Sequence, residues 1–278
     1  MIWLNGKFLP DSEAMVSVLD RGLLLGDGLF ETLLVKNERP IWFQEHWARF
    51  ENSAQYGFFS IPNLATEIHD VIVRLSQDMP GGDGVARITL TRGTGVQGLI
   101  IHPKTHVNLC VSIAKPTAPS APNGIRLGFA PDRRSTGGQE WGHKTLQFMH
   151  SVRALHQVQA QGFDDALWLG KGGELLECTT SNLFLVHKGK ILTHPTDGSI
   201  LPGTCRAKVL GLCVKLGIEA LESVVFSEIL PDCEECFITT SVRGVVSVRG
   251  VGELQHFNSA GKILQALKIE ILSEFANN

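Results

Sequence analysis

Lys144 is the residue of this chain whose surroundings best suit covalent chemistry. It lies between a strand-and-loop segment and an apolar-striped segment that predicts a helix. Most lysines are solvated surface residues, so the position alone is weak evidence. Burial and neighbouring cations lower the pKa of a lysine, however, and its free amine can then attack an aldehyde. Lys144 is therefore the candidate nucleophile.

Glu177 lies 33 positions after Lys144, at the end of an apolar strand-like run. A carboxylate in such a place is costly to bury unless it has a partner. A protonated pyridine nitrogen would be one such partner. The alternative is a solvated acid at a strand end, which this short motif alone favours.

Arg49 lies on a predicted helix, and its guanidinium fork suits a phosphate dianion. For any single helical arginine the stronger expectation is an ion pair on the helix surface. Glu45, one helical turn earlier, is the acid that would form it.

A second pattern suited to phosphate begins at the turn Leu201-Pro202-Gly203. The helix predicted after this turn would start with the N–H groups of Thr204 and Cys205, which could hold a phosphate. Such turns are common, so the pattern has modest specificity. Thr240 and Ser241 end an apolar strand and add hydroxyl groups, although they also suit the polar start of a loop.

The composition is that of an ordinary globular protein, and it excludes several classes. The chain has 278 residues, 43% hydrophobic and 19% charged, with a net charge of −3. A protein that coats nucleic-acid phosphates would need a basic face instead. No window holds the apolar run of a membrane span, and the N-terminus lacks the layout of a signal peptide. We therefore expect a cytosolic protein.

The cysteines, histidines and glycines offer further motifs, none of which the sequence favours. Cys233-Glu234-Glu235-Cys236 has CxxC spacing, but no second pair completes a zinc site, and the two acids oppose thiolate formation. The ten histidines form no HExxH and no tight cluster, so we expect no metal. Gly93 to Gly98 matches GxGxxG, yet no helix follows it, as dinucleotide binding requires. A glycine-rich loop between strands is the better interpretation.

A proline-rich segment, 115–124, divides the chain. It holds three prolines and ends in a glycine, so it cannot continue a helix or a central strand. We predict an N-terminal α/β domain over 1–114, an interdomain linker over 115–124 and a C-terminal domain over 125–278. Strands and helices mix without strict βαβ alternation, so the expected class is α+β, or mixed α/β, rather than a doubly wound sheet.

Apolar periodicity predicts the main helices. The segments 44–56, 64–77 and 204–216 have helical spacing and end at or near a glycine or a glycine-rich stretch. A further helix is expected over about 146–161. Its predicted buried stripe is Leu146, Met149, Val152, Leu155 and Val158.

Taken in order along the chain, these motifs resemble those of one family, the class IV aminotransferases. That family includes branched-chain aminotransferases, D-amino-acid aminotransferases and aminodeoxychorismate lyases. The resemblance covers nearly the whole chain. The motifs that carry it are Asp20-Arg21-Gly22, Gly26-Asp27-Gly28-Leu29-Phe30-Glu31-Thr32, Glu45-His46 with Arg49, His143-Lys144-Thr145-Leu146, Glu177 with Ser181-Asn182-Leu183-Phe184, and Leu201-Pro202-Gly203 with Arg206.

The resemblance implies a two-domain, fold-type IV enzyme that uses pyridoxal 5′-phosphate (PLP) bound in the C-terminal domain, and usually a homodimer. Lys144 would be the Schiff-base lysine and proton shuttle. Glu177 would keep the pyridine nitrogen protonated, so that the ring acts as an electron sink. The other cofactor-binding residues that the resemblance implies are Arg49, Thr179, Thr180, Thr204, Cys205, Thr240 and Ser241.

The chain departs from the family at residues that would bind substrate. Phe30 stands where D-amino-acid aminotransferases carry a tyrosine, and a phenyl ring cannot donate that hydrogen bond. Gln97-Gly98-Leu99 likewise replaces an Arg-x-His motif of those enzymes. The hypothesised partners of a substrate carboxylate are Arg243, Arg133 and Arg134, each of which also suits a solvated loop.

The leading hypothesis is an aminotransferase that moves an amino group between an amino acid and a 2-oxo acid through Lys144. The main alternative is an aminodeoxychorismate lyase on the same scaffold, which releases pyruvate and leaves 4-aminobenzoate. A third hypothesis is a non-catalytic binding protein of this fold, which the joint presence of Lys144, Glu177 and Arg49 disfavours. The sequence does not identify the amino donor or acceptor.

Overall fold

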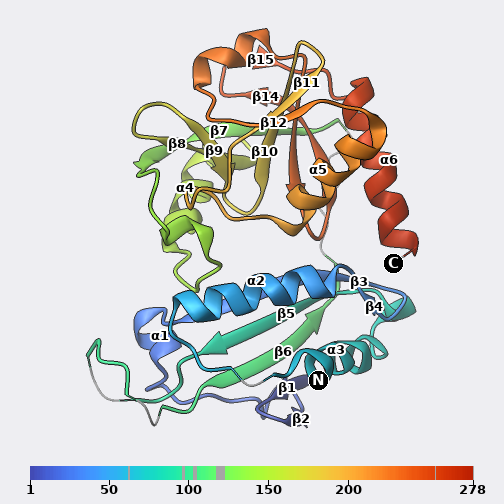
Figure 1. Cartoon of the computed structure of the whole chain (residues 1–278). Coiled ribbons are helices and arrows are strands. Elements are labelled where there is room, and N and C mark those ends of the chain that lie inside the picture. Colours follow the sequence, from blue (N-terminus) through green and yellow to red (C-terminus); the bar gives the residue numbers. More distant parts are fainter. Residues whose placement is uncertain (62, 96–97, 103–104, 117–122, 254, 278) are drawn as a thin grey trace. The chain divides into compact units, whose positions relative to one another are not determined.

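The computed structural model describes the whole chain except residues 62, 96–97, 103–104, 117–122, 254 and 278. The chain forms two compact units, each of which makes most of its residue contacts within itself (Figure 1). Unit 1 takes in Met1–Thr117 and Lys144–Gln147, and unit 2 takes in Ala118–His143 and Phe148–Asn277. Much of the expected linker, 115–124, lies outside the described residues. The short segment 144–147 belongs by its contacts to unit 1, which the sequence did not suggest.

Unit 1 contains an antiparallel sheet of six strands in the order β2-β1-β6-β5-β3-β4. The long central pairs join β3 to β5 and β5 to β6. The strands are β1 (Ile2–Leu4), β2 (Lys7–Leu9), β3 (Gly28–Lys36), β4 (Arg39–Pro40), β5 (Gly84–Thr91) and β6 (Asn108–Ala114).

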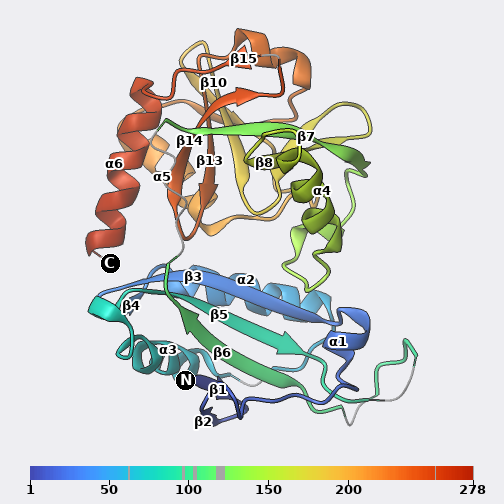
Figure 2. The same cartoon turned by 180° about the vertical axis from the view of Figure 1, so that it is seen from behind.

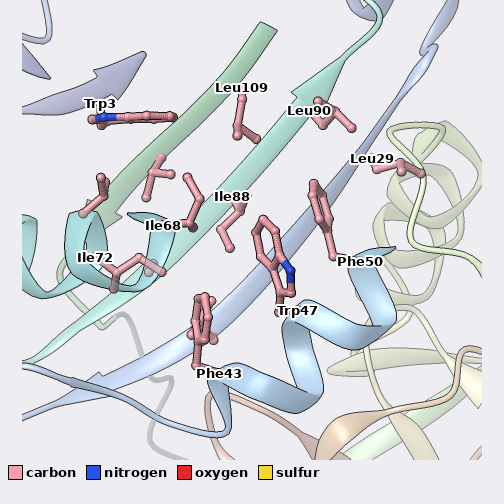
Figure 3. Close-up of a cluster of buried hydrophobic side chains, with 14 of the residues drawn as sticks. Trp3, Leu29, Phe43, Trp47, Phe50, Ile68, Ile72, Ile88, Leu90 and Leu109 are labelled. Atoms are coloured by element: carbon pink, nitrogen blue, oxygen red, sulfur yellow. The ribbon is translucent and has the colours of Figure 1, made fainter. Parts of the chain in front are cut away.

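Two helices cover one face of this sheet, α2 (Phe43–Tyr56) and α3 (Ala65–Ser76). Both match the predicted helices, and α3 buries Ile68, Val71, Ile72 and Leu75 along one face. Figure 3 shows Phe43, Trp47 and Phe50 of α2 pointing toward the strands, beside side chains of α3 in the same core. A shorter helix, α1 (Arg21–Leu25), precedes β3 and begins at the N-cap Asp20.

Alternation along β3 separates two kinds of side chain. Leu29 and Leu33 join the core under α2 and α3, and Glu31 lies on that same face. Phe30 and Thr32 therefore point to the opposite face. This single strand thus positions one acid among the helices and one aromatic ring on the other side of the sheet.

Unit 2 is built on a nine-stranded sheet in the order β12-β11-β10-β13-β14-β7-β8-β9, with β15 paired to β14. Because β10 also pairs with β9, six of these strands form a closed ring. The strands are β7 (Ile125–Arg134), β8 (Asp165–Gly170), β9 (Leu175–Cys178), β10 (Asn182–His187), β11 (Lys190–Thr193), β12 (Ala220–Glu222), β13 (Glu235–Thr240), β14 (Gly244–Val251) and β15 (Gln255–His256).

Three α-helices pack on this sheet. Helix α4 (Met149–Gln159) lies against β7 and β8, whereas α5 (Thr204–Leu216) and α6 (Lys262–Asn277) lie side by side (Figure 1, Figure 2). Helix α5 ends at Gly217, as predicted, in the left-handed conformation (φ 67°) that favours glycine. Within the described residues, no helix is both long and apolar enough to cross a membrane.

The predicted stripe on α4 was partly wrong. Val158 is buried as expected, but Met149 and Val152 are 72% and 60% exposed, and Ser151 and Ala154 face the core instead. The reason is local. Leu146 is paired to β3 as extended chain, so the helix begins later and its buried face is rotated from the one predicted.

Candidate functional site

Lys144 lies in extended chain that pairs with the beginning of β3. The N–H of Phe30 donates to the carbonyl of Lys144 at 3.0 Å, and the N–H of Leu146 donates to the carbonyl of Gly28 at 2.9 Å. Gly28 allows this approach, because a Cβ there would collide with the side chain of Leu146. The backbone of Lys144 is therefore held by hydrogen bonds on either side of it.

The Nζ of Lys144 lies 4.5 Å from the centre of the Phe30 ring. Arg87 of β5 contacts the same ring, with its guanidinium carbon 3.9 Å from the ring centre. Within the described part of the chain, no carboxylate forms an ion pair with Arg87. Sequence reasoning missed this arginine, although strand alternation places it on the sheet face that Phe30 occupies.

Arg49 takes part in a buried cluster beneath the sheet. Its Nε donates to one oxygen of Glu31 at 2.8 Å and its Nη2 to the other at 2.7 Å, while the Nδ1 of His46 lies 2.7 Å from Glu31 Oε2. Glu31 and His46 are fully buried. The sequence offered Glu45 as a partner for Arg49. In the structure the Arg49 side chain, 8% exposed, forms a two-point pair with Glu31 of the neighbouring strand.

The charges in this cluster follow from its geometry. Burial by itself raises the pKa of Glu31, but the positive charge of Arg49 and hydrogen bonds from His46 and Arg49 bring it down to about 2. Burial lowers the pKa of His46, and the hydrogen bond to Glu31 opposes that shift. Lys144 is close enough for its charge to lower the pKa of His46 further. The cluster is thus an ionised acid, an arginine and a neutral histidine beside Lys144.

Glu177 is a buried carboxylate whose oxygens accept hydrogen bonds from Arg134, Asn182 and Leu201 in unit 2. Arg134 Nη1 donates to Oε1 at 2.9 Å. Asn182 Nδ2 and the N–H of Leu201 donate to Oε2 at 3.2 and 3.1 Å. The residue is 8% exposed. The expectation that this acid lies in solvent is therefore wrong, since both of its oxygens have donors inside the fold.

The closure of the sheet positions Glu177. Asn182 is its register partner in the pairing of β9 with β10. The Asn182 amide also donates to the carbonyl of Leu201 at 2.9 Å, so it ties the strand pair to the turn before α5. Gly203 in that turn is so close that a Cβ there would collide with Asn182 Oδ1. Glu177, the turn and the beginning of α5 consequently form one connected structure.

The beginning of α5 holds two of the predicted phosphate-binding residues. Thr204 and Cys205 are buried, and the N-cap Gly203 offers no side-chain cap. Burial raises the pKa of the Cys205 thiol, and the N–H of Thr240 contacts that sulfur. Because a buried neutral thiol is a poor phosphate ligand, any contact by Cys205 would be through its backbone N–H.

The predicted cofactor neighbours Thr179 and Thr180 differ in their surroundings. The Thr179 hydroxyl donates to Asp165 at 2.5 Å, whereas Thr180 is exposed. Burial raises the pKa of Asp165, and the hydrogen bond from Thr179 and the charge of Arg243 oppose that rise. Thr179 therefore has a buried partner of its own.

The three hypothesised substrate arginines are not equivalent. Arg243 is half-buried in the turn between β13 and β14, where its N–H donates to Thr240 Oγ1 at 2.9 Å. Arg133 is exposed and contacts the carbonyl of Gly170 at 3.3 Å. Arg134 is buried and paired with Glu177. The geometry thus favours Arg243 or Arg133 over Arg134 for contact with a substrate.

The CxxC and GxGxxG motifs, which the sequence analysis did not favour as functional sites, lie in structure that needs no ligand. All six cysteines are free, and burial raises the pKa of Cys233 to about 12, which keeps this CxxC thiol protonated. No helix follows Gly93 among the described residues of the GxGxxG run, of which 96–97 lie outside the described part. Gly93 itself adopts φ 72° and lies against the backbone of His106.

Comparison with known proteins identifies the family. The model of the family Amino-transferase class IV matches residues 28–251, which is most of the chain. A protein of Methanocaldococcus jannaschii named as a branched-chain-amino-acid aminotransferase is 32% identical over 270 residues, covering 96% of this chain and 93% of that protein. The chain belongs to the class IV aminotransferases, and it is an enzyme of that family.

Other relatives show the breadth of the family. A D-alanine aminotransferase of Bacillus licheniformis is 28% identical, covering 99% of this chain and 98% of its own length. An aminodeoxychorismate lyase of Bacillus subtilis is 24% identical, covering 100% and 95%. Among solved structures, the T.th. branched-chain amino acid aminotransferase with pyridoxamine 5′-phosphate gives a TM-score of 0.90 at 25% identity, covering 99% of this chain and 94% of that one. The predicted mixed α/β, fold-type IV class is confirmed, and enzymes of this family depend on PLP.

Proposed function

We propose that this chain binds PLP covalently through the Nζ of Lys144 and transfers an amino group between an amino acid and a 2-oxo acid. The observation that carries the proposal is Glu177, a buried carboxylate held by three donors at the turn that begins α5. Such a carboxylate is held in one orientation by its donors, so it suits a protonated ring nitrogen as a further hydrogen-bond partner.

The residues present fit the rest of the cofactor. The N–H groups that begin α5 suit a phosphate, and this end of the helix dipole favours an anion. The guanidinium of Arg49 offers a second phosphate ligand, and Glu31 holds it in one orientation. Thr240 and Ser241 would add hydroxyl groups, and Thr179 and Thr180 would lie beside the ring.

When bound, PLP supplies an aldehyde that joins amines and a ring that withdraws electrons. The chain supplies the rest of the chemistry. The Nζ of Lys144 would hold the cofactor and, as a free amine, would take the proton from the substrate Cα.

Transamination is the leading reaction, and loss of pyruvate, as in an aminodeoxychorismate lyase, is the alternative. Phe30 under Lys144 would form part of the substrate pocket. Arg87, which contacts the same ring, joins Arg243 and Arg133 as a candidate partner for a substrate carboxylate. Replacing the true partner by glutamine should raise the substrate KM about tenfold or more, since a charge-assisted hydrogen bond is lost. An unchanged KM shows that the substituted arginine does not bind the substrate carboxylate.

The absorbance spectrum of the purified protein tests the cofactor and its anchor. We expect a visible band from bound cofactor that Lys144→Ala abolishes, whereas Lys171→Ala, which removes an exposed lysine, leaves it unchanged. A panel of L- and D-amino acids is then added. Conversion to the pyridoxamine form by one of them supports transamination, and pyruvate release from 4-amino-4-deoxychorismate without an acceptor supports the lyase. A protein that takes up no PLP contradicts the proposal.

The chain is also proposed to work as a homodimer, as the family resemblance implied. The support is an exposed apolar surface in unit 1. It is formed by Val18, Leu19, Leu23, Leu24, Leu99 and Ile100, each more than half exposed. A monomer rarely exposes so many large apolar side chains together. The cytosolic location stays a prediction.

A further inference from the structure

Arg134 has an unusual environment for a charged side chain. It is 4% exposed, and its guanidinium carbon lies 4.1 Å from the ring centre of Trp141 and 4.2 Å from that of Trp168. Trp141 comes from a short 3-10 helix, Glu140–Gly142, and Trp168 from β8. Two elements distant in sequence thus supply aromatic faces to one buried cation.

The guanidinium is directed at Glu177. Its Nη1 donates to Oε1 at 2.9 Å, while Oε2 is occupied by Asn182 and Leu201. The acid proposed to face the cofactor's ring nitrogen is therefore already partnered by a full positive charge. Two consequences follow: the orientation of the carboxylate is set, and part of its negative charge is offset.

We propose that Arg134 is a positioning residue that acts on the cofactor through Glu177. It orients the carboxylate toward the ring nitrogen and offsets its charge, so that the nitrogen is less basic than it would be against an unpaired carboxylate. This inference rests on the proposed function, since it needs PLP at Glu177. It assigns Arg134 a role other than binding a substrate carboxylate.

The sign of the effect follows from electrostatics. A proton shared between a carboxylate and a ring nitrogen is bound less tightly when a cation stands nearby, because the cation repels the proton's charge. Removing the cation raises the proton affinity of the nitrogen. The cation and the carboxylate are in direct contact inside the protein. We therefore expect removal of the cation to raise the proton affinity of the ring nitrogen about tenfold or more, which is one pKa unit.

Two titratable groups lie near the pair, Cys178 and His150. Burial raises the pKa of Cys178, the residue after Glu177 on β9, well above its ordinary value, so this thiol stays neutral. His150 of α4 contacts the rings of both Trp141 and Trp168, at 4.8 and 5.8 Å between ring centres. His150→Gln should therefore be included to separate its contribution from that of Arg134.

The experiment is ¹⁵N NMR of the protein loaded with PLP labelled at the ring nitrogen. We expect Arg134→Gln to move the nitrogen resonance toward the protonated position and to raise its titration midpoint by about one pKa unit. Arg134→Lys, which keeps the charge, should restore much of the unsubstituted value. Arg153→Gln removes an exposed arginine of α4 and should change nothing.

The outcomes are distinguishable. If the unsubstituted protein takes up no PLP, the proposed function fails. If PLP binds but the resonance in Arg134→Gln is unmoved, or moves toward the neutral position, the inference about Arg134 is overturned while the function stands. If Arg134→Gln does not fold, Arg134→Met replaces it, because its unbranched side chain still packs against the two indole rings. The same shift of the ring-nitrogen resonance is then expected.

Discussion

At the scale of single residues, Glu31 is a buried acid with partners on both of its oxygens. It lies fully buried, with Arg49 on both oxygens and His46 on one. Removing one partner from such a cluster leaves a buried charge without compensation, which is far more costly than losing an exposed pair. Glu31 therefore couples the stability of unit 1 to the orientation of Arg49.

This coupling predicts a pH-dependent loss of stability. The pKa of Glu31 is about 2 in the folded chain, against an ordinary value of 4.5, so its contribution is complete above about pH 5 and is lost as pH falls through the folded pKa. We expect Glu31→Gln to lower the free energy of unfolding by about 3 kcal/mol at neutral pH, and by progressively less in acid. Urea unfolding between about pH 7 and pH 3 measures this difference.

A matched variant tests whether burial causes the effect. Glu67→Gln changes an exposed carboxylate on α3 in the same unit. It should cost little at any pH. If Glu31→Gln and Glu67→Gln behave alike, the buried cluster does not contribute as its geometry implies.

At the scale of elements, the ring of strands in unit 2 closes at the pair that carries Glu177. Asn182 pairs with it across β9 and β10 and bonds to the turn before α5. The proposed partner of the ring nitrogen and the proposed phosphate site are thus linked through one asparagine. A disturbance of the turn should therefore reach the carboxylate.

Gly203→Ala is predicted to produce this disturbance. The new Cβ would collide with Asn182 Oδ1, which must move and take its hydrogen bond to Glu177 with it. We expect a loss of about 1–3 kcal/mol in stability, as for overpacking, together with weaker PLP binding. Thermal melting and a PLP titration of the apoprotein measure the two effects.

The control lies in the same helix. Gly211 of α5 has open space at its Cβ position. Gly211→Ala should stabilise the protein by up to about 1 kcal/mol, because alanine is the better helix former. Equal effects of the two substitutions would show that the contact with Asn182 is unimportant.

At the scale of the whole molecule, exposed apolar side chains of unit 1 lie on α1 and on a loop bonded to it. Leu23 and Leu24 of this helix are 68% and 59% exposed. Arg21 connects α1 to the loop that carries Leu99 and Ile100, donating to the carbonyl of Gly98 at 2.6 Å. The two apolar segments therefore belong to one surface, which a second copy of the chain would cover.

The corresponding prediction concerns oligomeric state. Leu24→Asp places a charge in the proposed interface, and we expect a dimer to become a monomer, since an unpaired buried charge opposes association. Val214→Asp, at an 83% exposed site on α5, should leave the dimer intact. Light scattering after size-exclusion chromatography gives the mass. A monomeric unsubstituted protein would refute the homodimer.

The sequence by itself determined the family and most of the elements. Ordered motifs around Lys144, Glu177 and Arg49 carried the resemblance, and apolar spacing predicted α2, α3 and α5 closely. These features are local, because apolar periodicity, the glycines that end helices and the order of motifs can all be read from short stretches of sequence.

Only the tertiary structure decided which charges meet. Glu31 with Arg49, and Arg134 with Glu177, are pairs between elements, and neither spacing nor periodicity relates their members. The late start of α4 has the same origin, because the pairing of Leu146 with β3 overrides local helix propensity. Long-range pairing and burial, rather than residue type, decide whether an acid or an arginine is solvated or held in place.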